Sequence, residues 1–183
     1  MMNRFLSLLI LLIPMHLSAE TSSFHSFKKT TLDRKQIDFS RYKNKVLLVV
    51  NIASKCGYTP QLKGLQNLYD KYKNKNFEVI AFPSNDFNQE PLEGIKIGDF
   101  CKKNYGVDFT IFQKISVRGP DADPVYKFLS TSSKNGDVKW NFEKFIVNGS
   151  GQVIARFDSD TKPESESVTQ KIEKAVNLQA SKP

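Results

Sequence analysis

Two short apolar runs, at residues 46–53 and 77–82, enclose a segment of helical periodicity, and this pattern limits the folds open to the chain. The runs are short and rich in β-branched or aromatic residues, which predicts two buried strands. Between them, residues 61–72 carry apolar side chains at three- and four-residue steps, as an amphipathic helix does. Such a strand–helix–strand unit implies two parallel strands joined by a right-handed crossover.

The rest of the chain completes an α/β sandwich. We expect helices at 93–105, 124–129 and 164–178, and a hairpin of two strands at 142–147 and 153–157. Gly94 and Gly98 weaken the first of these helices, Asp123 caps the second, and Phe24 and Phe27 join a short strand. Parallel strands, a later hairpin and flanking helices predict a thioredoxin-like fold with a central mixed sheet flanked by helices.

The first 19 residues have the layout of a secretory signal peptide. Arg4 precedes an apolar stretch at 5–13, Pro14 ends it, and Ala19 offers a small residue before the cut. The stretch is too short to span a bilayer comfortably, although an uncleaved membrane anchor is the alternative. We expect residues 1–19 to be a signal peptide, 20–183 to form a single domain, and the protein to be exported to the periplasm or secreted.

The chain of 183 residues carries a net charge of +8, which favours anionic surfaces. Loss of Arg4 with the leader would reduce the charge to about +7, that is 8 − 1. The lysines are spread out and make no dense basic run of the kind that binds nucleic acid. We therefore expect no nucleic-acid partner and leave open a contact with a lipid membrane surface.

Two cysteines, Cys56 and Cys101, are 45 residues apart and belong to no C-x-x-C pair. With only two histidines in the chain, we expect neither a zinc site nor a cofactor. In an exported protein the two cysteines could form a permanent structural disulfide, or a reaction pair that closes and opens.

Cys56 follows the first predicted strand and precedes the helix, where a thioredoxin-like architecture carries its reactive cysteine. Thr59 is expected to be the N-cap and Pro60 the first helical residue. The positive end of the helix dipole and the adjacent Lys55 both favour a thiolate at Cys56. A buried, inert thiol is the alternative.

Three stretches occur in the order found in glutathione peroxidases, namely 51–61 (NIASKCGYTPQ), 82–91 (FPSNDFNQEP) and 139–145 (KWNFEKF). On these motifs the chain resembles the glutathione peroxidase family from about Phe24 to the last helix. The resemblance implies that Cys56 is the peroxidatic cysteine and that Gln89, Trp140 and Asn141 complete a catalytic tetrad. Amide and indole N–H groups can donate hydrogen bonds to the sulfur or to the oxygen that leaves.

The loop that carries Gln89 departs from the usual pattern, Cys-Asn-Gln-Phe-Gly-x-Gln-Glu-Pro. Ser84 replaces the cysteine, Asp86 replaces the first glutamine, and the loop is one residue shorter before Gln89. We expect these changes to shift Gln89 slightly and Asp86 to work against a thiolate nearby.

The resemblance also implies a reaction cycle. Cys101 lies where thioredoxin-dependent members carry a resolving cysteine, so the reductant is expected to be a thioredoxin-like dithiol protein rather than glutathione. The short segment 120–140 resembles monomeric members that reduce phospholipid hydroperoxides. The predicted function is an exported thiol peroxidase for hydrogen peroxide and organic or lipid hydroperoxides, acting in the response to oxidative stress. Two rivals stay open: a disulfide oxidoreductase without peroxidase activity, and a non-catalytic secreted domain with a fixed disulfide.

Overall fold

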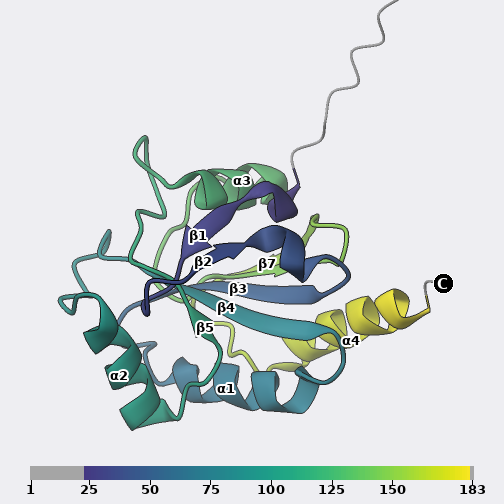
Figure 1. Ribbon diagram of the computed structural model, residues 1–183, viewed down its shortest axis with the longest axis horizontal. Helices are drawn as coiled ribbons and strands as arrows, with labels where there is room; N and C mark the ends of the chain where they lie inside the picture. The colour runs from purple at the N-terminus through teal and green to yellow at the C-terminus, as the bar shows by residue number, and fades with distance from the viewer. Residues whose placement is uncertain (1–22, 182–183) are drawn as a thin grey trace, which may run out of the picture.

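A mixed sheet of five strands forms the centre of the computed structural model, which describes residues 23–181 (Figure 1). Its strands are β3 (Val46–Ile52), β4 (Phe77–Pro83), β5 (Thr110–Ile111), β6 (Lys144–Val147) and β7 (Val153–Phe157). They lie in the order β5-β4-β3-β6-β7, with β3, β4 and β5 parallel and β6 antiparallel to both of its neighbours. The strand–helix–strand unit, the hairpin and the thioredoxin-like fold are therefore confirmed.

Helices cover both faces of this sheet. They are α1 (Gln61–Tyr72), α2 (Ile95–Tyr105), α3 (Pro124–Ser133) and α4 (Glu166–Ala180). Helices α1, α2 and α4 share one face, whereas α3 lies on the other (Figure 1). The face that α3 covers also carries a small antiparallel ribbon of two strands, β1 (Lys28–Thr30) and β2 (Gln36–Asp38). Two 3₁₀ turns, η1 (Phe24–Ser26) and η2 (Phe39–Tyr42), lie on the same face.

Strand β3 is buried along its whole length because it supplies side chains to both cores. Leu48 and Val50 face α1 and α4, while Leu47 and Val49 face α3 and η2. Each of these side chains contributes about 1.5–3 kcal/mol by leaving water, which fixes the strand before the Cys56 loop begins.

Several element boundaries differ from the prediction. Phe24 lies in η1 and Phe27 is its C-cap, so neither belongs to a strand, and α3 continues to Ser133, past the predicted end at 129. Asp123 caps α3 as expected, since its carboxylate accepts a hydrogen bond from the Val125 N–H at 2.9 Å. Strand β6 begins at Lys144 rather than at 142 because Phe142 has a φ of 66°, which interrupts the extended backbone.

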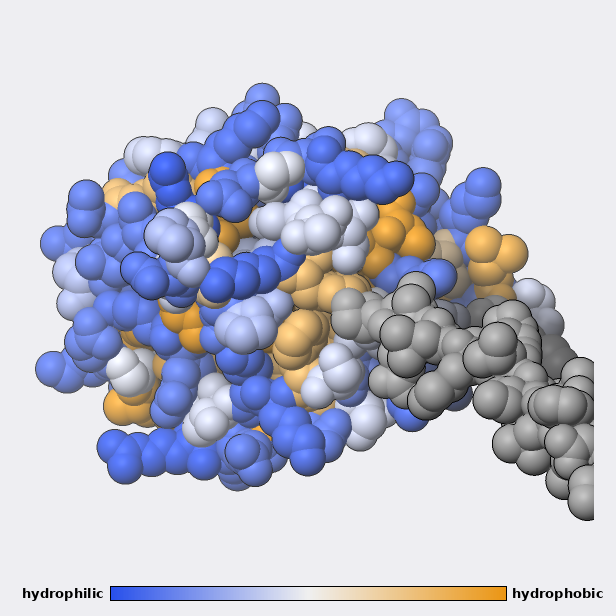
Figure 2. Space-filling model, turned by 90° about the horizontal axis from the view of Figure 1, so that it is seen from above, coloured by the Kyte–Doolittle hydropathy of each residue, from blue (hydrophilic) through white to orange (hydrophobic). Residues whose placement is uncertain are grey.

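The surface is mostly hydrophilic on the face shown in Figure 2, with apolar side chains near the middle of the view. Among the described residues, the large apolar side chains that are exposed belong to Ile95, Trp140 and Leu178. No helix within residues 23–181 is both long and apolar enough to cross a membrane. The predicted signal peptide at 1–19 lies outside the described residues.

Candidate active site

Cys56 lies in a series of turns between the end of β3 and the start of α1, and its side chain is 7% exposed. Its backbone N–H donates to the Thr59 hydroxyl at 3.0 Å, and that hydroxyl donates to the Ala53 carbonyl at 2.8 Å. The Tyr58 N–H points at the sulfur, with the nitrogen 3.4 Å from Sγ. A backbone donor of this kind stabilises negative charge on sulfur.

The predicted cap of α1 is therefore wrong. Thr59 uses its hydroxyl to close the Cys56 turn, and the N-cap position belongs to Pro60, which makes no side-chain hydrogen bond. The sequence pattern is typical of a helix start, but the Thr59 hydroxyl makes its hydrogen bonds within the preceding turn, to the Cys56 N–H and the Ala53 carbonyl.

A buried carboxylate attaches the loop of Gln89 to the segment before Cys56. Glu90 is 1% exposed and accepts hydrogen bonds from the Ser54 N–H at 2.8 Å and from the Ser54 hydroxyl at 2.7 Å. The same carboxylate accepts from the Leu92 N–H at 3.1 Å. The Lys55 N–H donates to the Gln89 carbonyl at 2.9 Å. The shorter loop thus still brings Gln89 beside the neighbour of Cys56.

The structure also brings the side chains of Gln89 and Asn141 together. The Asn141 Nδ2 donates to the Gln89 Oε1 at 2.9 Å, and Asn141 is fully buried. Its Oδ1 is buried as well and accepts no hydrogen bond within the described part of the chain. The Asn141 amide thus keeps an unused acceptor, and the Gln89 side chain keeps its own NH₂ group as a donor. Such a pair is suited to binding a small polar ligand.

Trp140 presents its indole at the surface rather than in the core. Its side chain is 40% exposed, and its ring centroid lies 5.0 Å from that of Phe87. Trp140 and Tyr58 line one recess of about 310 Å³, together with Asp158, Ser159 and Asp160. Trp140 is therefore not a core aromatic.

Asn51 is a site residue that the sequence reasoning missed. It is fully buried in β3, where its Nδ2 donates to the Trp140 carbonyl and its Oδ1 accepts from the Glu143 N–H, both at 3.0 Å. The Asn51 side chain thus attaches the Trp140–Asn141 segment to the central strand β3 by two hydrogen bonds. The available signal was a single polar residue inside the apolar run 46–53.

A buried ion pair holds the same segment from the other side. The Arg156 guanidinium lies 2.6 Å from the Glu143 carboxylate, and both side chains are almost fully buried. Glu143 also accepts from the Lys139 N–H at 2.6 Å, and Arg156 donates to the Gly136 carbonyl at 2.6 Å. Because the partners come from separate segments, no local pattern in the sequence could reveal this pair.

Comparison with known proteins decides the family. The model of the glutathione peroxidase family matches residues 24–130, more than half of the chain. This chain belongs to the glutathione peroxidase family. It is thus a peroxidase by class, and the resemblance inferred from the three motifs is confirmed.

Its relatives in the family include bacterial and fungal proteins. The glutathione peroxidase of Lactococcus lactis is 47% identical over 146 residues, which cover 78% of this chain and 93% of the relative. The glutathione peroxidase-like peroxiredoxin gpx1 of Schizosaccharomyces pombe is 51% identical over 147 residues, with coverage of 78% and 93%. The hydroperoxy fatty acid reductase gpx1 of Synechocystis is 40% identical over 153 residues, with coverage of 78% and 90%.

A solved structure agrees with the fold. The crystal structure of Trgpx in apo form superposes with a TM-score of 0.70 at 38% identity. The match covers 86% of this chain and 97% of that one.

Cys101, the second cysteine of this family member, lies on α2 and is 2% exposed. Burial, and then the charge of Glu90, raise the pKa of Cys101 to about 12. Both cysteines are free thiols. Helix α2 has Gly94 at its N-cap, with no side-chain hydrogen bond to its first turn. Cys101 is thus a buried, protonated thiol within a helix whose N-terminus has no side-chain cap. Its role as the resolving cysteine stays a prediction.

Asp86, expected to work against a thiolate, has a structural task in this family member. Its carboxylate accepts hydrogen bonds from the Val117 N–H at 2.6 Å, the Arg118 N–H at 3.2 Å and the Ser116 hydroxyl at 3.0 Å. These donors hold the Gln89 loop to the segment before α3.

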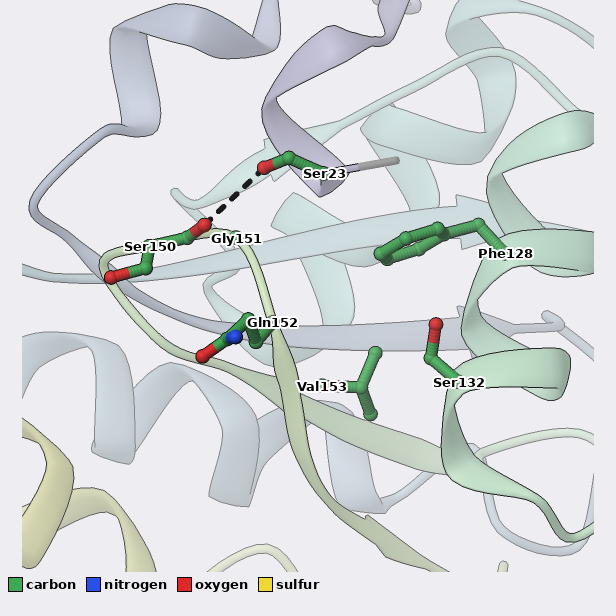
Figure 3. A pocket seen from close by; sticks show the side chains of 7 residues that line it. All are labelled: Ser23, Phe128, Ser132, Ser150, Gly151, Gln152 and Val153. Carbon is green, nitrogen blue, oxygen red and sulfur yellow. Dashed lines mark hydrogen bonds between the residues drawn. The ribbon is translucent and has the colours of Figure 1, made fainter. Parts of the chain in front are cut away.

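Other parts of the surface offer less chemistry. A pocket between α3 and the β6–β7 turn is lined by Phe128 and Ser132 on one side and by Val153 on the other (Figure 3). Ser23 donates there to the Ser150 carbonyl at 3.3 Å (Figure 3). The described residues that line this pocket include no cysteine and no ionisable side chain. Within residues 23–181, no three His, Cys, Asp or Glu side chains are grouped as metal ligands.

Proposed function

We propose that this peroxidase reduces hydrogen peroxide and organic hydroperoxides through Cys56. The Cys56 thiolate attacks the terminal peroxide oxygen, the O–O bond breaks, and an S–O bond forms. Cys56 becomes a sulfenic acid, and the other oxygen takes up a proton and leaves as water or an alcohol. The observation that supports this most is the Tyr58 N–H aimed at the Cys56 sulfur, in a loop joined to Gln89 through Lys55.

The three polar partners act as hydrogen-bond donors in this proposal. The Gln89 oxygen accepts from Asn141, which leaves the Gln89 NH₂ group to donate toward the reacting atoms. The indole N–H of Trp140 and these amides would stabilise the negative charge that develops on the leaving oxygen. Organic hydroperoxides are included because a relative that is 40% identical is a hydroperoxy fatty acid reductase.

The resolving step belongs to Cys101. Its thiolate attacks the Cys56 sulfenic acid, an S–S bond forms, and hydroxide leaves and takes up a proton as water. A dithiol protein of the thioredoxin type then reduces the disulfide, and the peroxiredoxin names of several relatives favour this reductant over glutathione. Since Cys101 is sealed in the reduced protein, α2 must open locally before the step.

We further propose that residues 1–19 are removed during export and that the monomeric protein acts in the response to oxidative stress, in part at lipid surfaces. The mass of the protein recovered from outside the cytoplasm tests the first point. A mass that includes residues 1–19 would contradict cleavage.

Steady-state consumption of peroxide tests the chemistry. We expect turnover with thioredoxin to exceed turnover with glutathione, and Cys56→Ser to abolish both. In a single turnover, one equivalent of peroxide should remove two free thiols from the wild type and a dithiol should restore them. Full activity in Cys56→Ser would refute the assignment, and unchanged thioredoxin turnover in Cys101→Ser would refute the resolving step.

A further inference from the structure

Lys144 is a fully buried lysine that the reaction above does not use. It is the first residue of β6, and its ammonium donates to three backbone carbonyls of the loop that follows β7. The acceptors are Thr161 at 2.6 Å, Asp158 at 3.3 Å and Ser159 at 3.4 Å. All three donors of one ammonium are thus directed at residues 158–161.

This loop forms a wall of the recess that Tyr58 and Trp140 also line. The recess is linked to the Cys56 turn through Tyr58, whose backbone N–H points at the Cys56 sulfur. Asp158, Ser159 and Asp160 line the recess together with Tyr58 and Trp140, which belong to the two predicted catalytic segments. Lys144 holds the loop by its backbone, so the ammonium sets where this wall lies.

The same loop is attached to the helix that follows Cys56. Gln61, the first residue of α1, donates from Nε2 to the Ser159 carbonyl at 2.6 Å. Further along, Asn67 donates to the Glu164 carboxylate at 3.0 Å, and Gly64 has no side chain where a Cβ would lie 2.9 Å from that carboxylate. The Ser159 carbonyl therefore joins Lys144 of the sheet to Gln61 of α1.

The positive charge on Lys144 allows it to hold the backbone carbonyls of residues 158–161. Burial lowers the pKa of Lys144 to about 8, while the carboxylates of Asp160, Glu143 and Asp158 act in the opposite direction. Near neutral pH the side chain is therefore a cation that can make all three hydrogen bonds. A neutral apolar side chain of similar length would fill the space and leave the carbonyls without their donor.

We infer that Lys144 is a positioning residue that shapes the recess for the organic group of a bulky hydroperoxide. This inference rests on the proposed function, because the recess matters only if peroxides react at Cys56. Hydrogen peroxide has no organic group to place in the recess, so it depends less on the wall. In this inference the large substituent of a hydroperoxide lies in the recess lined by residues 158–160, Tyr58 and Trp140.

The test compares two probes, hydrogen peroxide and cumene hydroperoxide, in the purified protein. For each variant the measured quantity is the ratio of the rate constants for Cys56 oxidation, cumene hydroperoxide over hydrogen peroxide. In Lys144→Met we expect this ratio to fall about tenfold, because the wall of the recess is no longer held in place. Trp140 is the only tryptophan of the chain, so its emission should shift in the same variant.

Two further variants complete the design. Lys127→Met removes an exposed lysine from α3 on the opposite face and should change neither the ratio nor the emission. Gln61→Met cuts the tie between Ser159 and α1 while keeping Lys144, and should lower the ratio in the same direction; it carries the test if Lys144→Met does not fold.

An unchanged ratio in the folded variants would overturn the inference. An equal loss for both peroxides would overturn it too, since Lys144 would then support Cys56 or the fold in general. Failure of the proposed function looks different, because hydrogen peroxide would then be consumed by Cys56→Ser.

Discussion

Replacing Asn51 by alanine should loosen the Trp140–Asn141 segment and destabilise the protein strongly. Asn51 is fully buried, and its amide pairs with the Trp140 carbonyl and the Glu143 N–H, each at 3.0 Å. Alanine removes both partners and leaves two buried backbone groups unpaired.

The expected size follows from these two contacts. An unsatisfied buried donor or acceptor costs about 1–3 kcal/mol, so the pair amounts to about 4 kcal/mol. That is a large share of the roughly 5–15 kcal/mol by which native domains are stable. With a urea slope of about 2 kcal/mol per molar, the unfolding midpoint should fall by about 2 M.

Urea unfolding followed by Trp140 fluorescence measures both the midpoint and the local environment. The matched control is Asn104→Ala, which removes an exposed asparagine whose amide donates to the Phe100 carbonyl at 2.8 Å on α2. The control should stay within about 0.5 kcal/mol of the wild type. If Asn51→Ala unfolded like the control and kept the native emission of Trp140, the reasoning about this residue would be refuted.

Two further predictions follow from the pKa shifts. Cys101 has its pKa raised from 9.0 to about 12, so at pH 8 its thiolate fraction is about a thousandfold smaller in the folded than in the unfolded protein. In Cys56→Ser the remaining thiol is Cys101, and its alkylation by iodoacetamide can be followed by mass spectrometry. The rate should be about a thousandfold lower, or lower still, in the native protein than in the urea-unfolded protein. Equal rates with and without urea would contradict this prediction. Lys144 has its pKa lowered from 10.5 to about 8, so between these values the unfolded chain binds more protons and stability rises with pH. Urea titrations of the wild type and of Lys144→Met give the difference between their unfolding free energies. This difference should increase in favour of the wild type by about 2 kcal/mol from pH 7.5 to 9.5. A decrease would show that the pKa of Lys144 is not lowered in the folded protein.

The elements that were predicted well are those whose signal is local. The periodicity of residues 61–72 matches the bounds of α1, and the apolar run at 46–53 matches β3 to within a residue. The hairpin of β6 and β7 follows from two β-rich runs around a short turn. The elements missed or misplaced, such as β5 with its two residues, have too short a pattern to stand out.

The candidate site divides in the same way. Cys56, Gln89, Trp140 and Asn141 are predicted as catalytic residues because their motifs stand in a known order along the chain. The contacts that hold them were not found, since Asn51 reaches Trp140 across 89 positions and Ser54 reaches Glu90 across 36. Thr59 shows that a residue typical of a helix N-cap can instead make its hydrogen bonds within the turn that precedes the helix.

The sequence by itself determined the strand–helix–strand unit, the hairpin of β6 and β7, the place of Cys56 after the first parallel strand, and the family. These properties depend on the spacing of residue types along a few turns or strands. Only the tertiary structure decided that Cys101 is buried, that Asn141 donates a hydrogen bond to Gln89, and that the Lys144 ammonium binds the backbone of residues 158–161. Burial and pairing of polar groups depend on which distant segments meet, and that is a property of the packed chain.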